Sequence, residues 1–162
     1  MRPGQWVLLT YRLPREPSSP RIAVWRKLKR LGAAQLGDGL VALPADARTR
    51  EHLDWLAEEI VEAGGTAGVW VARPATLAQE RDLARTMAAA RAAEYEAVAA
   101  EAEGRGELTE AERRRLLRRL RGELRRIQRR DYFPPPQRRA AETAVARLRA
   151  QDDTERTEEH TA

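Results

Sequence analysis

The stretch from Trp6 to Pro44 constrains the fold more than any other part of this 162-residue chain. Residues 6–11 form an apolar run of strand length, and Ser19 followed by Pro20 supplies an N-cap and a first helical residue. Gly37-Asp38-Gly39 is a tight hairpin turn signal. The order is therefore strand, helix, strand, turn and strand, with short connections.

A second helix, about residues 49–63, and a last strand, about residues 67–72, repeat this order. Residues 5–73 thus form two strand-helix-strand halves of similar length, which is typical of a split βαβ unit. We predict an α+β protein with a ferredoxin-like βαββαβ domain followed by a helical C-terminal region.

Hydrophobic periodicity predicts which large side chains are buried. Trp6 and Trp70 on strands and Trp25 on the first helix fall on expected core positions. Trp55 lies off the stripe of its helix, so it either closes the core edge or marks an interface. The first strand is apolar on both faces, so either the C-terminal helices or a second copy of the chain should cover the face that the two helices leave open.

After residue 74 the pattern changes to long helices. Capping boxes predict helices that start after Thr76 and after Thr109 and extend to about residues 103 and 131, followed by a short helix over residues 137–150. The second of these buries a leucine stripe. We divide the chain into a ferredoxin-like domain at 1–74, a helical arginine-rich region at 75–151 and a disordered acidic tail at 152–162.

The net charge of +5 is unevenly distributed. Residues 1–104 are neutral, residues 105–149 carry 15 arginines against six acids, and residues 150–162 carry one arginine against five acids. The basic charge therefore belongs to one helical segment, which points to a polyanionic partner for that segment.

Arginines recur along the helix that follows Thr109 at spacings of three and four, so they share one face opposite the leucines. Guanidinium groups bind phosphate oxygens bidentately, and this face is a candidate nucleic-acid surface. The alternatives are a solvated face, or a face screened by the acidic tail folding back on it. The candidate DNA-binding residues are a main row, Arg114, Arg118, Arg121, Arg125 and Arg129, and a flanking row that includes Arg115, Arg126 and Arg130.

A second basic patch lies on and before the first helix. Its charges either complement the helix dipole or hold an oxyanion, for which Arg12, Arg15 and Arg21 are candidates. The residues of this patch are Arg12, Arg15, Arg26, Lys27 and Arg30.

The chain has no cysteine and only two histidines, His52 and His160, so we expect no metal site and no cofactor. No nucleophile with a partner base is evident, and we expect a protein that is not an enzyme. No apolar run approaches the ~20 residues that span a bilayer, and the N-terminus is unlike a signal peptide, so we expect a cytoplasmic protein without membrane contact.

Three strings carry a family resemblance: WVLLTYRLPREP at residues 6–17, VWRKLKRLGA at 24–33 and RTRE at 48–51. With WLAEEI at 55–60 and EAGG at 62–65, they resemble the N-terminal domain of the chromate-resistance protein ChrB, over about residues 5–150. None of these strings is a catalytic signature.

The resemblance implies a bacterial regulator of a chromate efflux transporter. The resemblance implies a further C-terminal domain in the family's usual member, and we expect this chain to function without it. We therefore expect a chromate-resistance regulator that contacts DNA through its arginine-rich helix. The alternative is a non-catalytic interaction module that works with a separate sensor or effector domain, or with a second copy of the chain.

Overall fold

A computed structural model describes residues 2–104 and 106–161 and forms two compact units, residues 1–87 and 88–162. The sequence placed a boundary at residue 74. That boundary stays a prediction; the two compact units meet within the helix α3 (Leu77–Glu103), whose first turns belong to the first unit.

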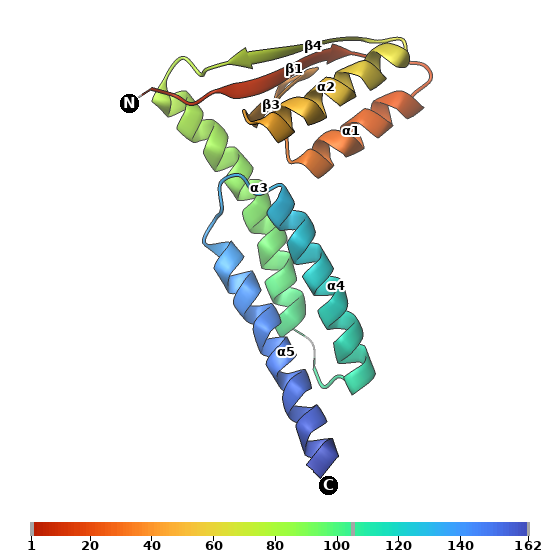
Figure 1. Ribbon diagram of the computed structural model, residues 1–162, viewed down its shortest axis with the longest axis vertical. Helices are drawn as coiled ribbons and strands as arrows, with labels where there is room; N and C mark the ends of the chain where they lie inside the picture. Colours follow the sequence, from red (N-terminus) through yellow and green to blue (C-terminus); the bar gives the residue numbers. More distant parts are fainter. Residues whose placement is uncertain (1, 105, 162) are drawn as a thin grey trace. The chain divides into compact units, whose positions relative to one another are not determined.

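The first unit contains a four-stranded antiparallel sheet in the order β2-β3-β1-β4 (Figure 1). Strands β1 and β2 lie on either side of β3, and β3 and β4 lie on either side of β1. The predicted α+β class is confirmed, as an antiparallel sheet with interleaved helices followed by three further helices. The elements are β1 (Trp6–Arg12), α1 (Ser19–Leu31), β2 (Ala34–Gly37), β3 (Leu40–Pro44), α2 (Ala47–Glu62) and β4 (Thr66–Ala72).

Helix α2 begins at Ala47, two residues before the predicted start, because Asp46 is its N-cap. The Asp46 carboxylate accepts a hydrogen bond from the Thr49 backbone N–H at 2.8 Å, and the Thr49 hydroxyl accepts one from the Asp46 N–H at 2.9 Å. This reciprocal pair satisfies two backbone donors at the helix start.

Both α1 and α2 lie on one side of the sheet (Figure 1). Their buried residues, with alternate residues of β1 and β3, form the core of this unit. The alternation of β1 therefore points one set of side chains at the helices and the other set at the open face. The fully buried hydrophobic residues of this core are Val7, Leu9, Leu43, Leu53 and Ile60.

The first turns of α3 cover part of the open face. The indole N–H of Trp6 donates to Glu80 Oε1 at 3.0 Å, and Leu83 lines a groove of about 380 Å³ together with Leu8. The predicted burial of Trp6 is confirmed, at 3% exposure. Helix α3 therefore covers part of the sheet face that α1 and α2 leave open.

The predicted burial of two other tryptophans, Trp25 and Trp70, is wrong. Trp25 is 50% exposed and Trp70 is 59% exposed. On α1 only Val24 and Leu28 are buried, so the apolar stripe is narrower than its residue types suggested. Trp70 lies on an edge strand, where its indole N–H donates to the Thr10 hydroxyl at 3.0 Å and no further layer covers its ring in this unit.

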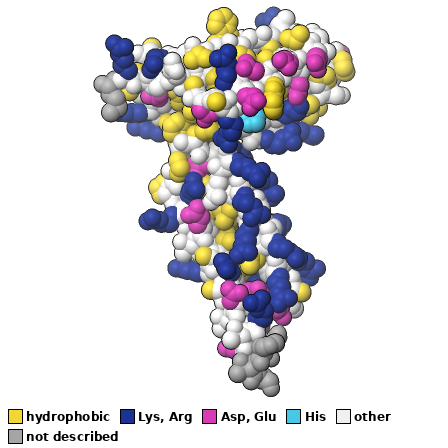
Figure 2. All heavy atoms as spheres, in the orientation of Figure 1, with side chains coloured by type: hydrophobic (Ala, Val, Ile, Leu, Met, Phe, Trp, Pro, Cys, Tyr) yellow, Lys and Arg dark blue, Asp and Glu magenta, His cyan; other side chains and the backbone are white. Residues whose placement is uncertain are grey.

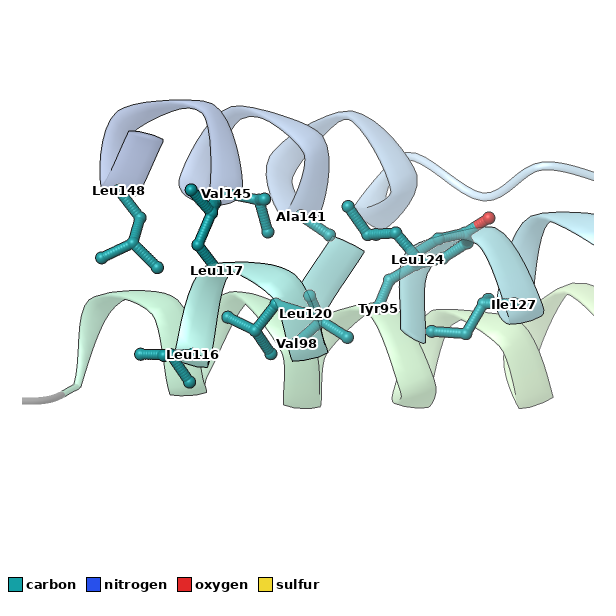
Figure 3. Close-up of a cluster of buried hydrophobic side chains, with 10 residues drawn as sticks. All are labelled: Tyr95, Val98, Leu116, Leu117, Leu120, Leu124, Ile127, Ala141, Val145 and Leu148. Atoms are coloured by element: carbon teal, nitrogen blue, oxygen red, sulfur yellow. The ribbon is translucent and has the colours of Figure 1, made fainter. Parts of the chain in front are cut away.

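The second unit packs the rest of α3 against α4 (Glu110–Arg129) and α5 (Gln137–Thr161). Figure 3 shows side chains from the three helices meeting in one apolar cluster. The predicted leucine stripe of α4 is confirmed, since all of its residues are buried: Leu116, Leu117, Leu120, Leu124 and Ile127. The cluster comprises Tyr95, Val98, Leu116, Leu117, Leu120, Leu124, Ile127, Ala141, Val145 and Leu148.

Helix α5 extends to Thr161, which corrects the predicted end of this helix at Ala150, whereas the disorder of the acidic tail stays a prediction. No glycine or proline follows Pro136, and the Arg149 guanidinium lies 3.7 Å from the Asp153 carboxylate one turn later. Such pairs support a helix. The last residue of the tail, 162, lies outside the described part of the chain.

Candidate nucleic-acid interface

Helix α4 is positioned by its cap and by its buried face. The Thr109 hydroxyl accepts from the Glu112 N–H at 3.3 Å and the Glu112 carboxylate accepts from the Thr109 N–H at 2.9 Å, so the predicted capping box is confirmed. The buried leucines fix the rotation of the helix about its axis. The opposite face is therefore held toward solvent.

Three residues of the predicted main row lie on this outward face without an acidic partner. Arg118 and Arg125 are exposed and Arg121 is half-buried. Among the side chains that the structure describes, no carboxylate forms an ion pair with any of the three. Figure 2 shows basic side chains gathered along the helical unit, in keeping with the composition of α4.

The first residue of the main row is neutralised within its own unit. Arg114 pairs with Glu110 on the preceding turn, and its Nε lies 3.9 Å from the Asp152 carboxylate of α5. Asp152 thus brings one tail carboxylate back to the arginine face, as the fold-back alternative requires, whereas Asp153 pairs with Arg149. The side chains of Glu155 and Glu159 lie outside those that the structure describes. Arg129, the last of the row, is exposed.

The flanking row is mostly engaged. Arg126 pairs with Glu123 at 2.6 Å, and Arg119 pairs with Glu101 of α3. Arg115 donates from Nε to the Ala111 carbonyl at 3.3 Å. These contacts leave the guanidinium groups at the surface, where they supplement the charge of Arg118, Arg121 and Arg125.

Arg130 does not belong to the outward face. Its side chain is 16% exposed and pairs with Glu94 of α3, which also lies 3.0 Å from Arg91 Nε. The helix ends at Arg129, so the position of Arg130 no longer follows the helical period that placed it in the flanking row. It serves the packing of the second unit instead.

Beside this cluster, the buried Tyr95 hydroxyl donates to Asp131 Oδ2 at 2.8 Å. Arg138 Nη1 lies 3.8 Å from the same oxygen. Burial, followed by this hydrogen bond, raises the pKa of Tyr95 above its ordinary value. These contacts join α3 to the segment that follows α4.

The structure reveals a buried arginine that the sequence analysis did not single out. Arg113 is 8% exposed, and its Nη2 donates to the Leu108 carbonyl at 3.3 Å. Arg113 lies three residues before Leu116 and four before Leu117, which places it on the apolar stripe of the helix. This spacing could have predicted its burial from the sequence. Of the adjacent arginines 113 to 115, only the last two face solvent.

The second basic patch is divided by the structure. Arg12, Arg15 and Arg26 line one hollow, together with Arg21. Lys27 pairs with Glu59 of α2, and Arg30 does not line the hollow. The three candidates for an oxyanion site, Arg12, Arg15 and Arg21, are thus brought together.

Two further classes of site were searched over the described residues. Within that part of the chain, no three side chains of histidine, aspartate or glutamate are grouped as a metal site would require. No helix there is long and apolar enough to cross a bilayer.

The fold and this interface define an α+β chain with a basic three-helix unit. Residues 21–105, just over half of the chain, match the family described as Protein ChrB, N-terminal. The chain belongs to this family, which is linked to chromate resistance. The matched region ends before α4, so the arginine face lies outside it. No curated protein and no solved structure matches the chain.

Proposed function

We propose that this chain contacts the phosphate backbone of duplex DNA through the arginine face of α4, and that this contact regulates chromate resistance. The observation that carries the proposal is the outward row of Arg118, Arg121 and Arg125, to which no described carboxylate is paired. Guanidinium groups bind phosphate oxygens in a bidentate way. We expect the contacts to position the protein rather than to read bases, because phosphates carry no sequence information.

The charge of α4 supports a polyanionic partner. The helix carries nine arginines against three glutamates, and like charges one turn apart destabilise a helix by a few tenths of a kcal/mol per pair. A phosphate backbone removes this repulsion and releases its condensed counterions. The buried leucines keep α4 folded without that partner, so the face is formed before DNA arrives.

We place this activity in the cytoplasm and assign no catalytic role. The proposed partners are DNA and either a second copy of the chain or a separate sensor domain. We also assign the sheet to the ferredoxin-like group. The two split βαβ halves, each with a strand of the other half between its own strands, support this assignment.

A second candidate function is a non-catalytic interaction module. The observation that favours it is the exposure of large apolar side chains on α2 and β4, with Trp55 at 56%, Trp70 at 59% and Val71 at 49%. Exposed tryptophan is enriched at protein interfaces. Light scattering tests self-association: a dimer that the substitution Trp70→Ser converts to a monomer favours this role, whereas a monomeric wild type counts against it.

Duplex binding tests the main proposal. The probes are a labelled duplex from upstream of the chain's own operon and a scrambled duplex of equal length, each titrated with and without chromate. Tighter binding of the native duplex that chromate releases supports a complete regulator. Equal binding of both with a steep salt dependence supports backbone contact and assigns sequence choice to a partner. Absence of binding near physiological salt removes the DNA proposal in favour of the interaction module.

A further inference from the structure

The first unit contains a hollow of about 1110 Å³ where β1 ends and α1 begins. Arg12 comes from the end of β1, Arg15 from the following loop, and Arg21 and Arg26 from α1. Chain topology thus gathers four guanidinium groups around one space, although their sequence positions span 15 residues.

The charges around this hollow are not balanced. Asp38, in the turn between β2 and β3, is the one acidic residue among its lining residues. Within the described residues, no ion pair joins a carboxylate to Arg12, Arg15, Arg21 or Arg26. These exposed cations repel one another, and an anion between them would lower that repulsion.

The start of α1 adds to the same positive potential. Its N-cap residue Ser18, which lines the hollow, makes no side-chain capping hydrogen bond, and the first turn contains no acidic residue. Arg21 stands in that turn, where the helix dipole disfavours a cation. A ligand anion in the hollow would lie near backbone N–H groups that the helix leaves without partners.

Aromatic and apolar side chains line the same space. Trp25 is 50% exposed and Ile22 is 47% exposed, both on the first turns of α1. Lys29 Nζ lies 4.3 Å from the centroid of the Trp25 ring, which leaves the rest of the indole surface for another contact. A planar ring stacked on an exposed tryptophan removes apolar surface from water.

Tyr11 also lines the hollow. Burial raises the pKa of this phenol, the charge of Arg21 lowers it, and Asp38 raises it. The net change is upward, so Tyr11 is protonated at neutral pH and can donate a hydrogen bond. A phosphate oxygen accepts such bonds.

We propose that this hollow binds a nucleotide, with the phosphate held by Arg12, Arg15 and Arg21 and the base stacked against Trp25. The hollow is large enough for this class, because its volume slightly exceeds the range of about 300–1,000 Å³ that is usual for small-molecule pockets. A bare tetrahedral oxyanion would use the arginines but leave Trp25 uncontacted. The site goes beyond the proposed DNA contact, since its residues lie in the first unit and not on α4.

Calorimetric titration of the full chain tests this site with three probes: AMP, inorganic phosphate, and a 5′-phosphorylated single-stranded oligothymidylate. AMP should bind at least tenfold tighter than phosphate. If AMP binds, the ligand of the site is a free nucleotide. Binding by the oligonucleotide alone, if it depends on the same residues, assigns the nucleotide to a strand end.

Two variants and one control separate this site from general charge effects. The pair Arg12→Gln with Arg21→Gln should weaken AMP binding at least tenfold, and Trp25→Leu should weaken AMP binding without changing phosphate binding. The control pair, Arg50→Gln with Arg85→Gln, removes the same charge outside the hollow and should leave binding unchanged. The proposal is overturned if neither AMP nor the oligonucleotide binds at millimolar concentration, if phosphate binds as tightly as the nucleotide probe, or if the control pair weakens binding as much as the first pair. Circular dichroism checks that each variant is folded, and α4 is intact in all of them.

Discussion

The Tyr95 hydroxyl donates a 2.8 Å hydrogen bond to the Asp131 carboxylate, and neither side chain is exposed to solvent. This contact joins α3 to the second residue after the end of α4. It therefore closes the helical unit at the end where Arg130, Glu94 and Arg91 also meet.

The substitution Tyr95→Phe should destabilise the second unit by about 1–3 kcal/mol, because it leaves a buried carboxylate oxygen without its donor. Urea unfolding followed by circular dichroism measures the change. Tyr11→Phe is the matched control, since the described structure gives the Tyr11 hydroxyl no hydrogen bond, and it should change the free energy of unfolding by less than about 0.5 kcal/mol. Equal effects of the two substitutions would contradict this account.

The raised pKa of Tyr95 predicts a pH dependence. Its folded-state pKa lies above the unfolded value of about 10, so the stabilisation is complete below pH 10 and is lost as the pH rises further. The free energy of unfolding of wild type should thus fall above about pH 10 more steeply than that of Tyr95→Phe. Tyrosinate absorbance should show that Tyr95 loses its proton at a higher pH than an ordinary phenol. The prediction is refuted if all three tyrosines of the wild type lose their protons near pH 10.

Two arginines of α4 should differ in how much their replacement by alanine lowers the stability of the protein. Arg113→Ala removes a buried stem and its bond to the Leu108 carbonyl, so it should destabilise the protein by about 1–3 kcal/mol. Arg118→Ala should change stability by at most about 0.5 kcal/mol, since Arg118 is exposed and has like charges beside it. Thermal unfolding compares them, and an equal loss in both variants would argue against the assigned orientation of α4.

The cap of α4 is a separate test of how the arginine face is positioned. Thr109→Ala should cost about 0.5–2 kcal/mol, because it removes the acceptor of the Glu112 N–H. Thr143→Ala, at an exposed position within α5, is the control and should have a smaller effect. Chemical denaturation measures the free energy of unfolding of both variants. If Thr109→Ala leaves it unchanged, the cap does not stabilise α4.

The sequence predicted the local elements well because their signals are local. Strand runs, the turn at residues 37–39, the capping box at Thr109 and the leucine stripe of α4 each depend on residues within a few turns of one another. Exposure depends on what packs above a residue, which is why Trp25 and Trp70 were placed wrongly.

For the candidate site, the helical period placed Arg118, Arg121 and Arg125 on one face, and the described structure agrees. It failed for Arg130, which lies past the end of the helix, and it passed over Arg113, whose charge concealed its position on the apolar stripe. The hollow formed by Arg12, Arg15, Arg21 and Arg26 needed the fold, since its full lining spans separate elements of the first unit.

The salt dependence of duplex binding tests the central claim most directly. The triple variant Arg118→Gln, Arg121→Gln and Arg125→Gln is compared with wild type and with a control that places glutamine at Arg50, Arg81 and Arg85, three exposed arginines of the first unit. The slope of log K against log salt should become shallower by about 0.9 for each phosphate contact removed, in the α4 variant alone. If the α4 variant keeps the wild-type slope, or if the control loses as much, the arginine face of α4 is not the DNA contact.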